Sequence, residues 1–165
     1  MLRDGRRDGL LLMGGAAPPM PPLVAATVAD LADVEALVAA AELTLDGLAA
    51  CVSGGTAVIC REHDGCLLGA AATERYGDVA FLRSVAVHAP VRWHGLGRAL
   101  VERALADARA AGAGEAWLLT ETAEPFFASL GWIRADRADA PAAVAASVEF
   151  TSACPTTAIA MRRRL

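Results

Sequence analysis

Residues 81–100 decide the fold of this chain, and they read FLRSVAVHAPVRWHGLGRAL. The apolar first part predicts a strand that ends at Val87, followed by a turn at Pro90 and a helix from about Arg98. Glycines between a strand and a helix let backbone N–H groups approach an anion closely, and the helix start adds unpaired donors and a partial positive charge. The stretch therefore predicts an anion-binding turn.

The turn carries the pattern Arg92-x-x-Gly95-x-Gly97, which resembles motif A of the GNAT superfamily of acyl-CoA-dependent acetyltransferases. In that family the motif follows a strand and holds the pyrophosphate of coenzyme A. Trp93 stands where the family usually has a small residue, and His94 where it usually has a basic one. The resemblance implies that acetyl-CoA is the cosubstrate and that it contacts Arg92, Trp93, His94, Gly95, Leu96, Gly97 and Arg98. The glycine spacing fits neither the dinucleotide-binding nor the P-loop pattern.

The chain beyond the motif is similar to the family in the order of its elements. We expect a helix over 98–111 that ends at Gly112 and Gly114, a strand over 116–120, a short helix over 123–130, and a strand opened by Gly131 and Trp132. The resemblance covers about residues 23–165. It implies a single-domain α/β (α+β) fold with a central mixed, mostly antiparallel sheet, which is splayed at the acyl-CoA site and flanked by helices.

The rest of the chain fits the same sheet. We expect strands over 23–28, 56–61, 66–76, 79–87 and 157–163, helices over 30–41 and 46–52, and a hairpin turn at Asp64-Gly65. Residues 1–22 have a basic start, a short apolar run interrupted by Gly14-Gly15, and a Pro-rich end. This pattern predicts a disordered extension rather than a signal peptide.

Composition sets limits on the function. The chain has 165 residues, a net charge of −4 and 15 basic residues, all of them Arg. The length is that of one domain. The sequence has no basic stripe and no apolar run of membrane-spanning length, which argues against nucleic-acid and membrane partners. The four cysteines form no Cys-x-x-Cys pair, so we expect reduced thiols and no bound metal. We also expect a cytoplasmic protein that is a monomer or a homodimer. Cys154, in an expected loop, is the one cysteine we consider for substrate contact.

Three short segments suggest a branch of the superfamily. They are Leu43 to Gly47, Phe126-Phe127, and Glu149-Phe150 with Cys154-Pro155 further on. Together they are similar to acetyltransferases associated with arsenic-resistance gene clusters. This narrower resemblance implies a small substrate.

The family resemblance also places the pantetheine arm against the motif strand. The backbone groups of Val85, Ala86 and Val87 are then the candidates that hold it, and one of their N–H groups would face the thioester oxygen. This role requires no particular side chain, so these residues can be plainly apolar.

The groups that move protons are less clear from the sequence. Many family members have a Tyr that protonates the leaving thiolate, four residues before the Gly-aromatic pair, and that position is Phe127 here. A base that relays the amine proton through water could be Glu74, Glu121 or His88, and each of these is also an ordinary surface residue. The absent Tyr leaves open a fold without catalysis.

Arg83 is the side chain of greatest interest on the motif strand. Strict alternation places it on one face with Phe81, Val85 and Val87, in a strand expected at mid-sheet, where a charge is costly unless paired. A hairpin turn at residues 77–78 sets Glu74 opposite Phe81 and diagonal to Arg83. Arg83 therefore forms either an ion pair with Glu74 or a bidentate contact with an anionic group of the substrate.

These observations predict an acetyl-CoA-dependent N-acetyltransferase for a small amine. An amino acid, or a phosphorus- or arsenic-containing analogue, is the candidate acceptor. The alternative is a non-catalytic acyl-CoA-binding or partner-binding domain with the same fold. Turnover with a panel of amines distinguishes the two.

Overall fold

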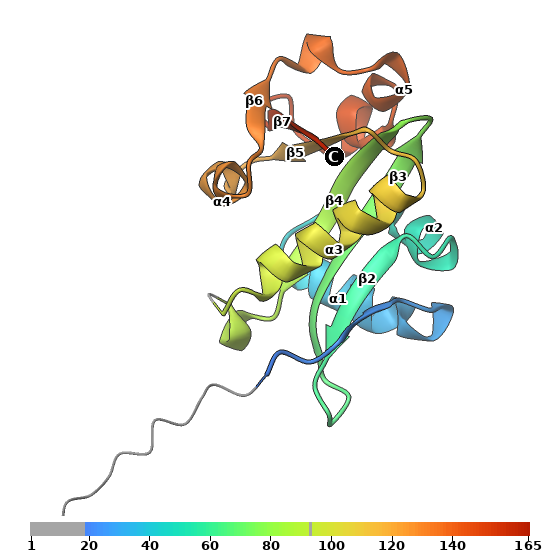
Figure 1. Ribbon diagram of the computed structural model, residues 1–165, viewed down its shortest axis with the longest axis vertical. Helices are drawn as coiled ribbons and strands as arrows, with labels where there is room; N and C mark the ends of the chain where they lie inside the picture. Colours follow the sequence, from blue (N-terminus) through green and yellow to red (C-terminus); the bar gives the residue numbers. More distant parts are fainter. Residues whose placement is uncertain (1–18, 93) are drawn as a thin grey trace, which may run out of the picture.

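A computed structural model describes residues 19–92 and 94–165 (Figure 1). The strands are β1 (Leu23–Ala25), β2 (Ala57–Arg61), β3 (Leu67–Tyr76), β4 (Val79–Val87), β5 (Glu115–Thr120), β6 (Ile133–Ala135) and β7 (Ile159–Arg164). The helices are α1 (Leu31–Ala40), α2 (Leu48–Ser53), α3 (Leu96–Ala110), α4 (Glu124–Ser129) and α5 (Ala142–Ala145). Short 3-10 turns lie at Val28–Asp30, Ala89–Val91 and Arg137–Asp139, and a π-helical turn at Glu149–Ala153.

The described residues form one seven-stranded sheet in the order β1-β2-β3-β4-β5-β7-β6. Neighbouring strands are antiparallel except β4 and β5, which are parallel. This arrangement confirms the expected mixed, mostly antiparallel sheet with flanking helices. In the described part of the chain, no helix is long and apolar enough to cross a membrane.

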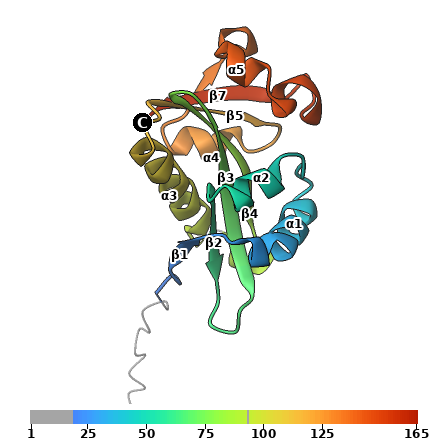
Figure 2. The same cartoon turned by 90° about the vertical axis from the view of Figure 1, so that its right-hand side faces the viewer.

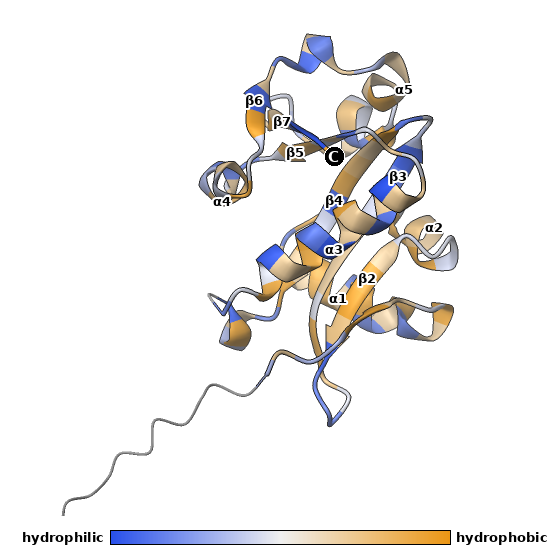
Figure 3. Cartoon of the chain, viewed as in Figure 1, coloured by the Kyte–Doolittle hydropathy of each residue, from blue (hydrophilic) through white to orange (hydrophobic). Residues whose placement is uncertain are grey.

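Helices cover both faces of the sheet (Figure 2). On one face Leu100 and Leu105 of α3 pack against the strands, and on the other Val34 of α1 and Leu48 of α2 do so. Alternation along β2 supplies both cores, because Val58 faces α3 while Ile59 faces α1 and α2. Figure 3 shows hydrophobic residues along β2 and β4 beneath α3, whose outer surface is largely polar.

The parallel pair β4 and β5 separates part of the way along. The ladder joins residues 79–81 of β4 to 115–117 of β5 and ends at the pair Phe81–Trp117. Beyond that pair, β4 continues beside β3 to Val87, and β5 continues beside β7 to Thr120. The sheet is therefore splayed in the middle, as the family resemblance implied.

A β-bulge interrupts β4 just after Arg83. Between the pairs Ala72–Arg83 and Ala70–Ala86, β4 has one residue more than β3. Ser84 has a φ of +53°, a conformation that non-glycine residues rarely adopt.

The bulge makes one expectation from the sequence wrong. Strict alternation placed Arg83, Val85 and Val87 on a single face. The extra residue shifts the alternation, so Val85 and Val87 pack against the α3 core, whereas Ala86 packs against the core under α1 and α2.

Several element boundaries also differ from the expected ones. Helix α3 begins at Leu96 rather than Arg98, because Gly95 has a φ of +83° and takes the N-cap position. Strand β1 ends at Ala25 rather than Val28, because the Thr27 N–H donates to Asp30 Oδ2 at 2.8 Å and closes a 3-10 turn. Helix α5 and the π-helical turn were not expected. Of the predicted extension at residues 1–22, positions 1–18 lie outside the described residues.

Candidate active site

The start of α3 forms a turn with unused backbone donors. Gly95 precedes the helix in the left-handed conformation, and the first N–H that returns to the turn is that of Ala99, which donates to Gly95 O at 3.1 Å. The N–H groups of Leu96, Gly97 and Arg98 lie in the first helical turn, where a helix offers them no acceptor. The turn therefore presents donors and a partial positive charge to an anion.

Two side chains of the motif fix the loop that leads into the helix. Arg92 Nε donates to Val87 O at 3.0 Å, and His94 Nδ1 lies 3.3 Å from Val91 O. The Arg92 and His94 side chains are exposed beside the turn. Trp93, which the sequence also assigned to coenzyme A, lies outside the described residues.

Gly97 lies where α3 approaches α4. A Cβ built on this glycine would be 3.4 Å from Phe126 Cζ and 3.6 Å from Val87 Cγ2. A larger side chain would therefore meet an aromatic ring on one side and the end of the motif strand on the other. The motif's second glycine keeps this side of the turn open.

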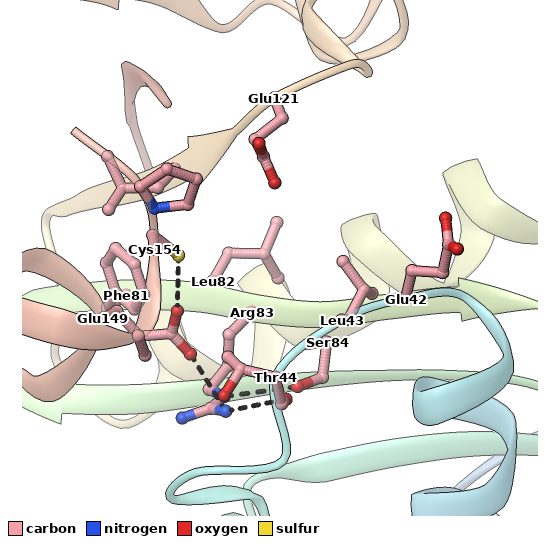
Figure 4. Close-up of a pocket in the computed structure, with 13 residues that line it drawn as sticks. Glu42, Leu43, Thr44, Phe81, Leu82, Arg83, Ser84, Glu121, Glu149 and Cys154 are labelled. Carbon is pink, nitrogen blue, oxygen red and sulfur yellow. Dashed lines mark hydrogen bonds and ion pairs between the residues drawn. The ribbon is translucent and has the colours of Figure 1, made fainter. Parts of the chain in front are cut away.

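A pocket opens next to the point where β4 and β5 separate. It is lined by residues 42–44, 81–84, Leu119, Glu121, Glu149 and 153–155 (Figure 4). Its walls come from the loop after α1, the bulged part of β4, the end of β5, and the π-helical turn with the residues after it. Val85, Ala86 and Val87 continue β4 from this pocket toward the anion-binding turn.

Arg83 occupies the inner wall of the pocket and is 5% exposed. Its Nη1 donates to Glu74 Oε1 at 2.5 Å, and its Nη2 lies 2.9 Å from Glu149 Oε1. Nε donates to Ser84 Oγ at 3.2 Å and Nη2 to Thr44 O at 3.4 Å. The structure thus brings Arg83 and Glu74 together as an ion pair and adds a second carboxylate that the sequence did not indicate.

Glu74 is engaged at both carboxylate oxygens. While Oε1 accepts from Arg83, Oε2 accepts a hydrogen bond from the Tyr76 hydroxyl. Burial, and then the neighbouring carboxylate, raise the pKa of Tyr76 to about 12, so the phenol stays protonated. Glu74 is not among the described residues that line the pocket.

Glu149 was not a candidate from its sequence pattern, and it is 4% exposed. Its Oε2 accepts a hydrogen bond from Cys154 Sγ at 2.9 Å. Burial raises the pKa of Glu149, and burial together with this carboxylate raises the pKa of the Cys154 thiol to about 12. The sequence marked Glu149 only as part of the segment that resembles the arsenic-resistance branch and as the lone carboxylate of residues 140–153.

The remaining candidates are dispersed. Glu121 is exposed and lines the pocket, as does the half-buried Cys154. His88 lies past the end of β4 and lines a different groove, between α1 and the β2–β3 hairpin. Phe127 is 7% exposed and contacts Phe126 and Trp132 edge-on. Groups of His, Cys, Asp or Glu able to hold a metal ion do not occur within residues 19–92 and 94–165.

A splayed sheet with a glycine-rich anion turn at the end of its central strand defines a class of acyl-CoA-dependent transferases. A model of the acetyltransferase (GNAT) family matches residues 30–132 of this sequence. The chain therefore belongs to the GNAT family. A search of curated proteins finds no match.

Solved structures with the same fold include N-acetylglutamate synthase from Neisseria gonorrhoeae, complexed with coenzyme A and N-acetyl-glutamate. The two share 21% identity and a TM-score of 0.77 over 91% of this chain, which spans only 36% of the synthase chain. Rv2747 from Mycobacterium tuberculosis, in complex with CoA, has 23% identity, a TM-score of 0.73, and coverage of 88% of this chain and 99% of its own.

A phosphinothricin acetyltransferase from Sinorhizobium meliloti, in complex with AcCoA, is a third relative in fold. It has 14% identity, a TM-score of 0.64, and 89% coverage of both chains. At these identities the likenesses establish a shared fold. The ligands named for these relatives are properties of those proteins.

Proposed function

We propose that this chain transfers the acetyl group of acetyl-CoA to the amine of a small molecule. One observation carries the proposal. The anion-binding turn, the backbone of residues 85–87 and the pocket beside Arg83 follow one another along β4 and its continuation. This is the order in which the phosphates, the pantetheine arm and the acceptor of such a reaction have to lie.

The residues of the turn fit the pyrophosphate of coenzyme A. The N–H groups of Leu96, Gly97 and Arg98 and the exposed guanidinium of Arg92 supply donors and positive charge. The absent Cβ of Gly97 supports this fit, because a side chain there would occupy the space between the turn and Phe126. When bound, acetyl-CoA supplies an activated thioester.

The backbone of Val85, Ala86 and Val87 would hold the pantetheine arm beside this strand. The splay of the sheet supports the assignment, because the ladder between β4 and β5 ends at Phe81 and the β5-facing backbone groups further along β4 lose their partner strand. An N–H of this segment would donate to the thioester oxygen and stabilise the charge that develops there.

The amine acceptor has to lose a proton, and Glu121 is the candidate base that suits this role best. It is exposed, it lines the pocket, and a water can connect it to an amine. Glu74 is held by Arg83 and Tyr76, and His88 faces another groove, so both are weaker candidates.

The acceptor class follows from resemblance. An amino acid acceptor is supported by the bound N-acetyl-glutamate in one relative of similar fold, and a phosphorus-containing analogue by the phosphinothricin acetyltransferase. An arsenic-containing analogue, Arg83 as its anion contact and Cys154 as a further contact remain proposals of the same kind. Cytoplasmic location and a monomeric or homodimeric state stay predictions.

The alternative, an acyl-CoA-binding domain without catalysis, has one observation in its favour. Phe127 stands at the family's acid position and is buried against Phe126 and Trp132. In an enzyme without that acid, the leaving thiolate would take its proton from water. This costs some rate but does not abolish the reaction.

The test is release of free thiol from acetyl-CoA with a panel of amines, amino acids and phosphorus- or arsenic-containing analogues. Amine-dependent thiol release, with the acetylated amine identified by mass spectrometry, supports the proposal. Tight binding of acetyl-CoA without thiol release for any amine supports the binding domain instead.

A further inference from the structure

The guanidinium of Arg83 is committed to the protein. Of its five N–H donors, one serves Ser84, one serves Glu74, and the Nη2 group faces both Thr44 and Glu149. The approach from the loop side is closed as well, because a Cβ built on Gly47 would lie 2.6 Å from Nη1. An acidic group of a ligand would therefore have to displace existing partners in order to reach Arg83.

The other charges of the pocket are negative. Glu42, Glu121 and Glu149 line it, and Arg83 is the one positively charged side chain among the described residues that do so. Glu74, which does not line the pocket, balances part of the positive charge of Arg83. The carboxylates that face the ligand therefore exceed the positive charge available to balance them.

Glu149 adds an observation that is independent of the charge count. This residue is 4% exposed, and its Oε1 makes no hydrogen bond to any described residue, although Arg83 Nη2 is 2.9 Å away. The ion pair with Arg83 offsets part of the cost of burying this charge. A positively charged group of a ligand in the pocket would stabilise the carboxylate further through space, without touching the enclosed oxygen.

From these contacts we infer that the acceptor is a cationic amine that carries a second positive charge and has no acidic group. The inference rests on the proposed acetyl transfer and replaces the acidic acceptor that the relatives of similar fold suggest, because Arg83 is already occupied by protein partners. The second ammonium pairs with the pocket carboxylates, while the reacting amine passes its proton to Glu121 through water. The new N–C bond forms as the thioester C–S bond breaks, and the released thiolate takes a proton from water.

The closing experiment compares three amines that share a four-carbon chain: putrescine, aminobutanol and γ-aminobutyrate. Their far ends are an ammonium, a hydroxyl and a carboxylate. Binding to the protein saturated with CoA is measured by calorimetric titration. We expect putrescine to bind about tenfold or more tightly than γ-aminobutyrate, with aminobutanol between them, which corresponds to at least about 1.4 kcal/mol. Salt should reduce the difference.

Two variants test the origin of this selectivity. Glu42→Gln removes a pocket carboxylate that takes no part in the proposed proton transfer, and it should narrow the ratio of the affinities for putrescine and γ-aminobutyrate. Glu62→Gln, in the exposed turn of the β2–β3 hairpin, is the matched control and should leave the ratio unchanged. Both variants are checked for folding by circular dichroism.

The outcomes separate this inference from the proposed function. Equal or tighter binding of γ-aminobutyrate, no binding of putrescine at millimolar concentration, or an unchanged ratio in Glu42→Gln would overturn the cationic acceptor. If the binding order holds but putrescine and related cationic amines release no thiol from acetyl-CoA, the pocket prefers a cationic ligand as inferred, and the catalytic proposal fails.

Discussion

Replacing Arg83 with Met tests whether this residue is a structural counter-ion. Met keeps most of the length of the side chain but removes the charge and all five donors. Glu74 and Glu149 would then be left without their cation, and their side chains are only 20% and 5% exposed. Breaking a buried ion pair by removing one partner costs about 3–5 kcal/mol. We therefore expect Arg83→Met to lower the free energy of unfolding by about that amount.

The matched control is Arg134→Met. Arg134 pairs with Glu124 at 2.7 Å, but its side chain is 64% exposed, so solvent screens the pair and its loss should cost little stability. Urea unfolding followed by circular dichroism gives both values under the same conditions. Similar losses in the two variants would show that burial of Arg83 has little energetic consequence.

Neutralising the abandoned carboxylates should restore stability in steps. Arg83→Met with Glu74→Gln removes one unpaired charge, and adding Glu149→Gln removes the second. We expect partial recovery in the double variant and further recovery in the triple variant, because each carboxylate makes its own contact with the guanidinium. A loss below about 1 kcal/mol in the single variant, or no recovery in the triple, would refute the counter-ion role.

The remaining predictions concern three other positions. Gly97→Val should weaken acetyl-CoA binding in calorimetric titration, since its side chain would meet Phe126 and close the turn; unchanged affinity would refute the assignment of the turn. Phe127→Tyr should cost about 1–3 kcal/mol of stability by burying a hydroxyl, with no gain in thiol release; a faster reaction would show that a phenol there reaches the thiolate. Burial raises the pKa of Glu149, so its protonated form stabilises the fold below the ordinary value of 4.5, and this stability is lost as pH rises through the folded-state pKa. The free energy of unfolding of Glu149→Gln, relative to the unmodified protein, should therefore increase as the pH rises above 4.5 in urea titrations, and a flat difference would contradict the shift.

Local patterns explain what the sequence could predict. The strand, turn and helix around residues 79–110 are defined by neighbouring residues, so their order and approximate bounds were predictable. The pairing of Glu74 with Phe81 was predictable for the same reason, because a two-residue turn fixes the register of a hairpin. Only the exact start of α3 was misplaced, by two residues.

Features that depend on distant parts of the chain were missed. The bulge at Ser84 appears only when β4 is aligned with β3, and no local pattern marks the extra residue. Glu149 reaches Arg83 because the sheet order brings the segment before β7 next to β4. Sequence spacing gives no access to that contact, so the second carboxylate beside Arg83 could not be assigned.

The position of Arg83 explains why a buried charge is tolerated next to the proposed acceptor pocket. Its partners Thr44 and Glu149 belong to two pocket walls that lie outside the strands of the sheet, so no strand ladder holds them in place. An apolar side chain at this position could fill the volume, but it could not direct a carbonyl and a carboxylate to fixed points. The planar guanidinium of Arg83 has donors on several sides, so it connects both walls to β4. The next residues of this strand would bind the thioester. The proposed acceptor pocket and the proposed acyl-CoA site are thus set by consecutive residues of one strand, which fixes the distance between the two sites.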